Sequence, residues 1–446
     1  MSNIAAPSRT EAPAAGELLA PVRTGLAAAL LTVLFVTVTP FLVEYDGGSS
    51  GNVLNQIVYS GLAGLVLVGH LALTERSVAL SLLRPSWLLM AGWLVVAALQ
   101  AHLPADALRA VLFTLIAMVA ATGVLCLPPS LRAFRAVLAI AALAALGLSY
   151  FGVVAMPGTA IHSAAGPEGG HAGLWRGAYS HKNVAGAVMA SIFFCGVYLL
   201  RCRQWLIGGA IAVLAGFFVL QTGSKTAAAL LPAVALLVMS SRSLGGRFVP
   251  ILVLSVALAI MALLTLGSVL SPALDGILQS IMPGTTFTGR TDLWRFALEV
   301  MRERQWTGFG FESFWRTAVV IGAEPGDTLA WDPRGSPNGH NGYLDIAIAI
   351  GWPGLAIAVL VLVILPFRDY VRAPSDRESS RLADLFLMSL SFVLLNAFLE
   401  SFFFERANPI WMSAWISIVG LRLLAHHRLH SPAELRDTPE PEPASR

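Results

Sequence analysis

Residues 248–270 read FVPILVLSVALAIMALLTLGSVL, a run without a single charged side chain. About 20 consecutive apolar residues of α-helix cross the hydrocarbon core of a bilayer, so this run predicts a transmembrane helix. The whole chain has the same character: 56% of its 446 residues are hydrophobic, 12% are charged, and the mean hydropathy is +0.72. This composition is far more apolar than that of a soluble globular domain. We therefore expect an all-α, polytopic integral membrane protein.

About twelve such segments follow one another, separated by short polar breaks or breaks that contain Pro and Gly. We place them at 25–43, 53–73, 87–103, 108–127, 134–155, 184–200, 205–221, 226–240, 248–270, 342–366, 384–403 and 408–425. The first apolar run is too long for a signal-peptide core and lacks a convincing cleavage site, so we expect it to be a retained first helix. The predicted organisation is one membrane domain over 25–425, with tails at 1–24 and 426–446.

The arginine residues set the expected orientation. With the amino terminus inside, every predicted cytoplasmic loop contains arginine, as the positive-inside rule requires. These residues are Arg76, Arg84, Arg132, Arg135, Arg201, Arg203, Arg242, Arg247, Arg368, Arg372, Arg377 and Arg381. Both tails then lie in the cytoplasm, and three segments lie outside: 156–183, 222–225 and a large periplasmic loop at 271–341 between helices 9 and 10.

The large loop contains a second pattern, an amphipathic helix over 290–304 that would lie on the membrane or on the protein. Its apolar face carries Leu293, Trp294, Ala297, Leu298 and Met301, and its other faces carry Arg295, Glu299, Arg302 and Glu303. Turns are expected after it, at Gly308, Gly310, Asp327, Pro333 and Pro337.

Several classes of function find no support in the sequence. The net charge is only +3 and the arginines are spread over many loops, which argues against nucleic-acid binding. Cys126, Cys195 and Cys202 have no CxxC spacing, so we expect free, structural thiols. The outer loops lack DxD, HxxE and HxxH patterns, and the chain has no Walker A lysine and no GxSxG elbow. We expect no metal and no cofactor, and the substrate itself must then supply the energy of any reaction.

Basic residues stand at the outer ends of the predicted helices. The chain has only two lysines, Lys182 and Lys225, and both fall there together with Arg176 and Arg290. Such groups suit an anion, and phosphate in particular. Three outer helix starts lie near Asn183, Thr226 and Asn341, where free N–H groups and the positive end of the helix dipole favour anions. The alternative is that the lysines only reach for the interface.

His340 closes the large loop, directly before Asn341 and one helical turn before Asp345. A histidine has the right unperturbed pKa to take a proton from a sugar hydroxyl near neutral pH. The alternative is a histidine that only caps the helix or hydrogen-bonds the loop. Ten residues after Asn341, Gly351-Trp-Pro-Gly354 permits a kink or a close helix contact.

Four motifs in this order carry a family resemblance. They are Arg176-Gly-Ala-Tyr-Ser-His-Lys-Asn-Val-Ala-Gly186, Thr222-Gly-Ser-Lys-Thr226, Gly289-Arg-Thr-Asp-Leu-Trp294 with Thr307-Gly-Phe-Gly-Phe-Glu-Ser-Phe314, and His340-Asn341 with Gly351 and Gly354. Together they resemble the O-antigen ligase and Wzy-type polymerase family, and within it the exopolysaccharide polymerases of the ExoQ type. The resemblance implies an all-helical membrane bundle with a large periplasmic loop.

The resemblance also implies roles for the residues of these motifs. His340 would be the base that activates the acceptor hydroxyl, and Arg290, Lys182, Lys225 and Arg176 would hold the undecaprenyl diphosphate of the donor. His181, Asn183, Asn341 and Trp294 would support them. One departure is Lys225, because many relatives have Arg there, so charge is kept while bidentate geometry is lost.

The implied function is an inner-membrane glycan polymerase of exopolysaccharide biosynthesis. It would join undecaprenyl-diphosphate-linked repeat units at the periplasmic face, with a lipid-linked glycan as both donor and acceptor. A flippase and a chain-length regulator in the same membrane are the expected protein partners. Three alternatives stay open: an O-antigen ligase that transfers glycan to lipid A core, a transporter or flippase of envelope glycans, and a scaffold subunit of a synthesis complex.

Overall fold

The computed structural model describes residues 15–42, 53–164, 169–240, 245–311, 313–323 and 332–427. Within these residues the regular elements are helices, and the β pairing is one isolated bridge between Ile161 and Trp175. The predicted all-α class is confirmed. Asp327 and most of the two predicted tails lie outside the described residues.

A helix overlaps each of the predicted membrane segments. The α-helices are α1 Ala15–Val36, α2 Val53–Leu73, α3 Arg76–Leu82, α4 Pro85–Leu99, α5 Pro104–Cys126, α6 Leu131–Ala155, α7 Pro157–Ala160, α8 Lys182–Arg201, α9 Trp205–Gln221, α10 Lys225–Ser240, α11 Phe248–Ala262, α12 Ser268–Leu270, α13 Pro272–Ile281, α14 Arg290–Met301, α15 Ala318–Ile321, α16 Gly342–Val359, α17 Leu365–Arg372, α18 Arg377–Asn396 and α19 Pro409–His426. Single π-helical turns join α11 to α12 and α16 to α17.

Among the described residues, seven helices are long and apolar enough to cross a membrane. The number is eight if α3 and α4, which are bent by 41° at their junction, form one broken span. α9 and α10 are shorter apolar helices. The structure therefore fits a polytopic membrane protein, and the count of about twelve spans stays a prediction.

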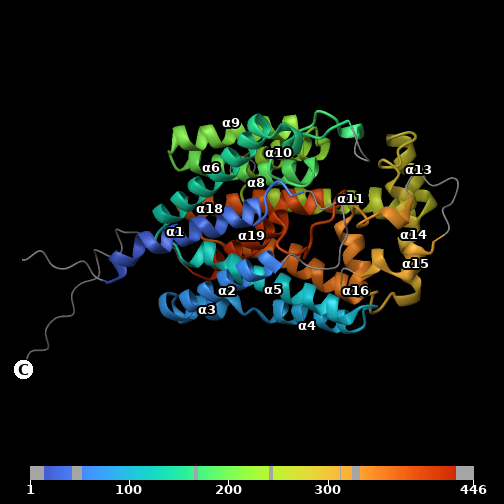
Figure 1. Ribbon diagram of the computed structural model, residues 1–446, viewed down its shortest axis with the longest axis horizontal. Coiled ribbons are helices and arrows are strands. Elements are labelled where there is room, and N and C mark those ends of the chain that lie inside the picture. Colours follow the sequence, from blue (N-terminus) through green and yellow to red (C-terminus); the bar gives the residue numbers. More distant parts are fainter. Residues whose placement is uncertain are drawn as a thin grey trace, which may run out of the picture.

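The two carboxy-terminal helices form the centre of the bundle. α18 and α19 pack against each other and against α8, and α18 also packs on α10 (Figure 1). Large side chains of this pair, such as Phe392 and Trp411, are fully buried. A helix that is surrounded by other helices can be apolar on all its faces, and α18 has this pattern from Leu385 onward, after a polar first part.

One end of the bundle is held together by arginine contacts to the region around α17 and α18. Four residues from separate parts of the chain take part: Arg84 pairs with Asp369 at 2.8 Å, Arg201 pairs with Asp384 at 2.7 Å, Arg135 pairs with Glu378, and Arg247 donates to the Ser380 hydroxyl at 2.9 Å. We call this region the arginine end. All four arginines lie in loops that the sequence analysis placed on one side of the membrane, so the structure brings these loops to a common end.

The helix α16 is broken where the sequence predicted a kink. Gly351 has φ 73° and ψ 175°, a conformation that interrupts the helix. The carbonyl groups before the break find partners elsewhere: Phe309 N donates to Ile348 O and Gly310 N to Ala349 O, both at 2.9 Å, and Trp93 Nε1 donates to Ile350 O at 2.8 Å. The break therefore joins the segment after α14 to the middle of α16.

The predicted amphipathic helix is α14. Its Leu293, Trp294, Ala297 and Met301 are buried, and Arg295 and Glu299 are exposed. α13, α14 and α15 lie together at one end of the elongated molecule, on the right of the view (Figure 1). Trp294 of α14 packs in a second, smaller hydrophobic core.

Two predicted segments have the wrong bounds. The first span was placed at 25–43 after a tail at 1–24, but α1 begins at Ala15 and ends at Val36, because Glu17 and Arg23 lower the hydropathy of its first turns. The second lies near the carboxy terminus. The sequence analysis placed a span at 384–403, but α18 begins at Arg377 and ends at Asn396. The error arises because Phe402, Phe403 and Phe404 follow the helix and raise the local hydropathy, although they are buried in a loop. We call residues 397–408 the α18–α19 loop.

Candidate functional site

A large cavity opens where several helices begin. Its volume is about 1600 Å³, and its lining includes the first residues of α8, α10, α14 and α16 and much of the α18–α19 loop. α8 and α18 run from this cavity to the arginine end, so the two regions lie at opposite ends of the bundle. The helix starts that were predicted as an anion site therefore do converge on one space.

Among the charged residues of the cavity lining, the basic ones outnumber the acidic ones. Its Lys and Arg residues are Arg109, Lys182, Lys225, Arg290, Arg316 and Arg406, and its acidic residues are Asp345, Glu400 and Glu405. Helix N-termini add free N–H groups and the positive end of the peptide dipoles. The arrangement suits an anionic ligand that is larger than a simple ion.

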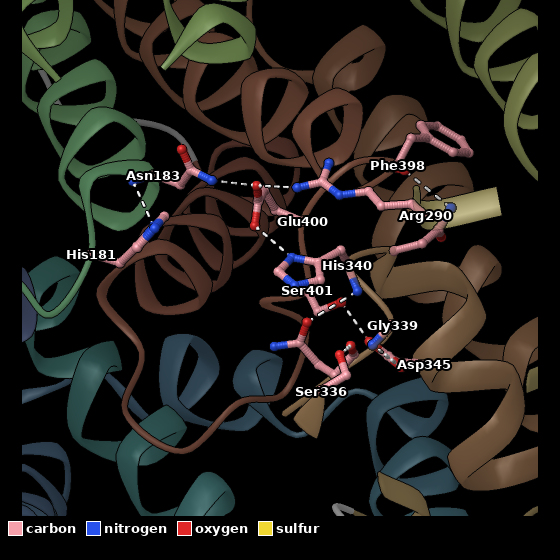
Figure 2. Close-up of polar contacts among 12 residues, drawn as sticks. His181, Asn183, Arg290, Ser336, Gly339, His340, Asp345, Phe398, Glu400 and Ser401 are labelled. Atoms are coloured by element: carbon pink, nitrogen blue, oxygen red, sulfur yellow. Dashed lines mark hydrogen bonds and ion pairs between the residues drawn. The ribbon is translucent and has the colours of Figure 1, made fainter. Parts of the chain in front are cut away.

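Glu400 lies at the centre of a polar network in this cavity. Its Oε1 accepts hydrogen bonds from Asn183 Nδ2 at 2.6 Å and from Arg290 at 3.0 Å. Its Oε2 lies 3.4 Å from Nδ1 of His340, a long contact. Figure 2 shows Glu400 between Asn183 and Arg290, with the His340 ring beside the other carboxylate oxygen. The two oxygens therefore serve different partners.

The surroundings of Glu400 favour its ionised form. Burial by itself would raise the pKa of the carboxyl, but the hydrogen bond with His340 and the positive charge of Arg290 outweigh burial and lower the pKa. The side chains of Glu400 and Arg290 are both 13% exposed. The pair is thus a largely desolvated ion pair, in which the loss of one partner leaves the other charge uncompensated.

Arg290 is the first residue of α14 and points into the cavity. The residue before it, Gly289, has φ 84°, which a side chain would disfavour. Arg290 contacts Glu400 through Nη2, and its buried Nε has no acceptor among the described residues. One turn along the same helix, Trp294 Nε1 donates to Gly339 O at 2.7 Å. α14 therefore both presents a cation and holds the segment before His340.

His340 has an unusual backbone conformation. Its φ is 48°, in the left-handed region that is uncommon for residues other than glycine. The conformation is stabilised locally, since its N–H donates to Asn338 Oδ1 at 3.0 Å. The ring lines the cavity, and the side chain is 19% exposed.

The start of α16 and the α18–α19 loop form one frame. Asn341 is fully buried; its Oδ1 caps α16 at Leu344 N, and its Nδ2 donates to Phe398 O at 3.1 Å. Gly342 N lies 2.7 Å from Ala397 O and 3.1 Å from Glu400 O. His340 and Glu400 are therefore fixed by adjoining backbone that is hydrogen-bonded across the interface.

Asp345 supports the same frame from inside α16. Its carboxylate accepts both from Gly339 N at 3.0 Å and from Trp315 Nε1 at 2.9 Å, and it is also bonded to the Ser401 hydroxyl. These bonds tie together the residues next to His340 and next to Glu400.

The start of α8 forms the opposite wall. His181 is the N-cap of the helix, and its Nδ1 accepts from Asn183 N at 3.2 Å. Burial, together with nearby His162, His171 and Lys182, lowers the pKa of His181 to about 4, although Glu400 acts in the other direction. His181 is therefore neutral at pH 7, as its capping role requires.

The two lysines differ in their surroundings. Lys182 is 9% exposed, and its backbone N–H donates to His162 Nε2 at 3.2 Å. Lys225 is exposed at the start of α10, after a tight turn in which Gly223 has φ 60°. Both side chains line the cavity.

Arg176 is the one predicted diphosphate ligand that the structure does not bring to the cavity. Its Nε donates to Thr159 O at 2.6 Å and its guanidinium also contacts Ser180 O at 3.3 Å. It is 6% exposed and absent from the lining. In this conformation Arg176 connects α7 to the segment that leads into α8.

Sequence reasoning missed Glu400 and gave Asp345 no role. Glu400 falls inside the predicted span 384–403, among apolar neighbours. A carboxylate inside such a segment was itself a signal, because ionisable residues at membrane depth are rare and usually have a partner or a function.

Two comparisons with known proteins bear on the site. Residues 210–359 match the model of a protein family described as O-Antigen ligase. A stretch of 237 residues is 27% identical to a protein named "Exopolysaccharide production protein ExoQ" from Rhizobium meliloti (strain 1021), and covers 50% of this chain and 53% of that protein. The match thus spans about half the length of the curated relative. Both findings confirm the resemblance seen in the motifs; Lys225, Arg290 and His340 fall inside the family match, and Lys182 and Glu400 fall outside it.

Proposed function

We propose that the protein is an inner-membrane glycan polymerase that joins undecaprenyl-diphosphate-linked repeat units in exopolysaccharide biosynthesis. The observation that carries the proposal is the convergence of His340 and Arg290 on one large basic cavity, where both contact Glu400. A base and an anion site side by side are what a transfer from a diphosphate leaving group needs.

The donor diphosphate would bind at the helix starts. Arg290 offers a buried N–H that has no acceptor within the described chain, and Lys182 and Lys225 add point charges. The N-termini of α8, α10 and α14 contribute dipoles of the same sign. Arg176 would act indirectly in this scheme, by holding the segment that positions Lys182.

The acceptor would be the non-reducing sugar hydroxyl of a second lipid-linked glycan. His340 takes the hydroxyl proton as the oxygen attacks the anomeric carbon, and the bond from that carbon to the diphosphate breaks. The cations stabilise the negative charge that develops on the leaving group. A single displacement of this kind inverts the configuration at the anomeric carbon.

The size of the cavity supports two substrates. Pockets for one small ligand usually have about 300–1,000 Å³, and this cavity has about 1600 Å³. The donor head group and the acceptor sugar therefore have room to meet beside His340.

The same proposal gives the orientation in the membrane. The arginine end would face the cytoplasm with both termini, and the cavity would face the periplasm, with about twelve spans over 25–425 and the loop 271–341 between helices 9 and 10. A flippase that delivers lipid-linked units and a chain-length regulator are the protein partners that this reaction calls for.

An O-antigen ligase that transfers glycan to lipid A core is the second candidate, because the matching family carries that description. Its donor and its base would be the same, so the site does not separate the two. The acceptor does: a ligase would modify lipopolysaccharide, and a polymerase would lengthen the lipid-linked glycan.

A test in cells uses matched variants. The gene is deleted, and the wild-type chain, His340→Ala or Arg290→Ala is expressed at equal membrane level. His102→Ala and Arg295→Ala are controls, because both side chains are exposed and neither lines the cavity. Glycan size on a gel should show single lipid-linked units for the site variants and polymer for the controls. Full-length polymer from both site variants would overturn the proposal, and glycan that moves onto lipid A core would establish the ligase instead.

A further inference from the structure

We propose that Glu400 is a positioning residue that couples donor binding to the activation of the acceptor. It holds Arg290 through one carboxylate oxygen and His340 through the other, and a diphosphate that engages Arg290 strengthens the pairing of Glu400 with His340. This inference rests on the proposed function.

The geometry shows that Glu400 is shared unequally. Oε1 has two close donors, Asn183 at 2.6 Å and Arg290 at 3.0 Å, whereas Oε2 has His340 at 3.4 Å. Arg290 competes with His340 for the same negative charge. When an anionic ligand pairs with the Arg290 guanidinium, the Glu400 carboxylate interacts less with Arg290 and more with His340. In a desolvated site this change in interaction energy is large.

The contact also selects the nitrogen that can act as base. A carboxylate that accepts the Nδ1–H of His340 leaves the lone pair on Nε2 for the acceptor hydroxyl. During transfer the hydroxyl proton moves to Nε2, the new glycosidic C–O bond forms, and the C–O bond to the leaving diphosphate breaks. Glu400 keeps its negative charge throughout and stabilises the imidazolium, in the manner of the acid in a Ser-His-Asp triad.

The backbone contacts around Glu400 allow an experiment to distinguish the coupling role of its carboxylate from a purely structural role. The backbone before Glu400 is held by Gly342 N to Ala397 O at 2.7 Å and Asn341 Nδ2 to Phe398 O at 3.1 Å, and Ser401 after it donates its hydroxyl to Asp345. None of these contacts uses the Glu400 carboxylate. Glu400→Gln should therefore change the charge and leave the loop in place.

The test uses the full-length protein in lipid nanodiscs and lipid-linked glycan units extracted from cells that lack the gene. Turnover is measured against pH for the wild type, Glu400→Gln, Glu400→Asp and the control Glu299→Gln, which is exposed on α14. For Glu400→Gln we expect kcat to fall about 100-fold, on the scale of lost general-base catalysis, with no rise in the KM of the donor. The acid limb of its pH profile should move to lower pH, because a neutral amide stabilises the imidazolium less than a carboxylate does. Glu400→Asp should recover part of kcat, and Glu299→Gln should match the wild type.

A second measurement does not depend on turnover. The rate at which diethyl pyrocarbonate modifies His340 is followed by mass spectrometry, with and without inorganic pyrophosphate. Pyrophosphate should slow the modification several-fold in the wild type, and most of this protection should be lost in Glu400→Gln.

The outcomes separate the two proposals. An unmoved acid limb, or equal protection by pyrophosphate in both proteins, overturns the role of Glu400 while an active wild type leaves the proposed function intact. A wild-type protein that makes no polymer from the extracted units overturns the proposed function itself.

Discussion

Replacing Gly351 with alanine should destabilise the protein by several kcal/mol, because the break in α16 needs a residue without a side chain. At φ 73° and ψ 175° a non-glycine residue is strained by about 1–3 kcal/mol. A Cβ at this position would also lie 2.5 Å from the backbone C and O of Trp306, and neither atom can rotate away. Overpacking of this kind costs about 1–3 kcal/mol more.

The two effects add to about 2–6 kcal/mol. Near the melting temperature the unfolding entropy is about 2.1 cal/mol/K per residue, which for 446 residues gives about 1 kcal/mol per degree. The apparent Tm in detergent, read by size-exclusion chromatography after heating, should therefore fall by roughly 2–6 °C. Polymer output should fall as well, since the break anchors the segment that follows α14.

The matched control is Gly147→Ala. Gly147 lies within α6, and a Cβ added there would meet no atom within 4 Å, so alanine should be neutral or stabilising by up to about 1 kcal/mol. If Gly351→Ala were as stable and as active as Gly147→Ala, the reasoning that the break requires glycine would be refuted.

Four further outcomes are expected. Trp294→Phe removes the donor to Gly339 O and leaves that carbonyl without its partner, at a cost of about 1–3 kcal/mol. Steady-state kinetics should show a lower kcat with an unchanged KM for the donor. A raised KM with an unchanged kcat would contradict this expectation. The pKa of His181 is about 4 in the folded protein and about 6.5 in the unfolded chain, so the unfolded state binds more protons between these values and the free energy of unfolding falls as pH falls from about 6.5 to about 4. His181→Asn keeps a capping acceptor, and its Tm should therefore fall less over that pH range. Identical curves of Tm against pH for the wild type and the variant would count against the low pKa of His181. Arg201→Ala leaves the buried Asp384 without its cation and should lower stability by about 3–5 kcal/mol, checked by Tm against the exposed Arg203→Ala. Lys225→Arg should retain polymer output and Lys225→Ala should reduce it, and equal output from the two would remove Lys225 from the donor site.

The sequence predicted the parts of the site that depend on helix starts. Lys182, Lys225 and Asn341 were placed at helix starts because hydropathy locates the first residues of membrane helices, whereas Arg290 was placed by the amphipathic pattern of 290–304. In the structure Lys182, Lys225 and Arg290 are the first residues of their helices, and Asn341 is an N-cap. The break at Gly351 was equally visible, since its motif combines small residues with proline.

The remaining parts depend on contacts between distant positions. Glu400 meets Arg290, His340 and Asn183 across 110, 60 and 217 residues of chain, and no local pattern encodes such a meeting. The aromatic residues that follow it also resemble a membrane segment when hydropathy is averaged over a window. Arg176 is a different case, because its charge suggested a ligand site while its partners in the structure are the backbone carbonyls of Thr159 and Ser180.

The arginine end has a consequence for how the protein is made. Arg84, Arg135, Arg201 and Arg247 are all synthesised before the carboxylates and hydroxyl that they contact between Asp369 and Asp384. α18 and α19 are also synthesised after the helices α8 and α10 that pack against them. The contacts that close the bundle at the arginine end can therefore form only after α17 and the start of α18 have been synthesised, so this end is completed later than the packing among the earlier helices.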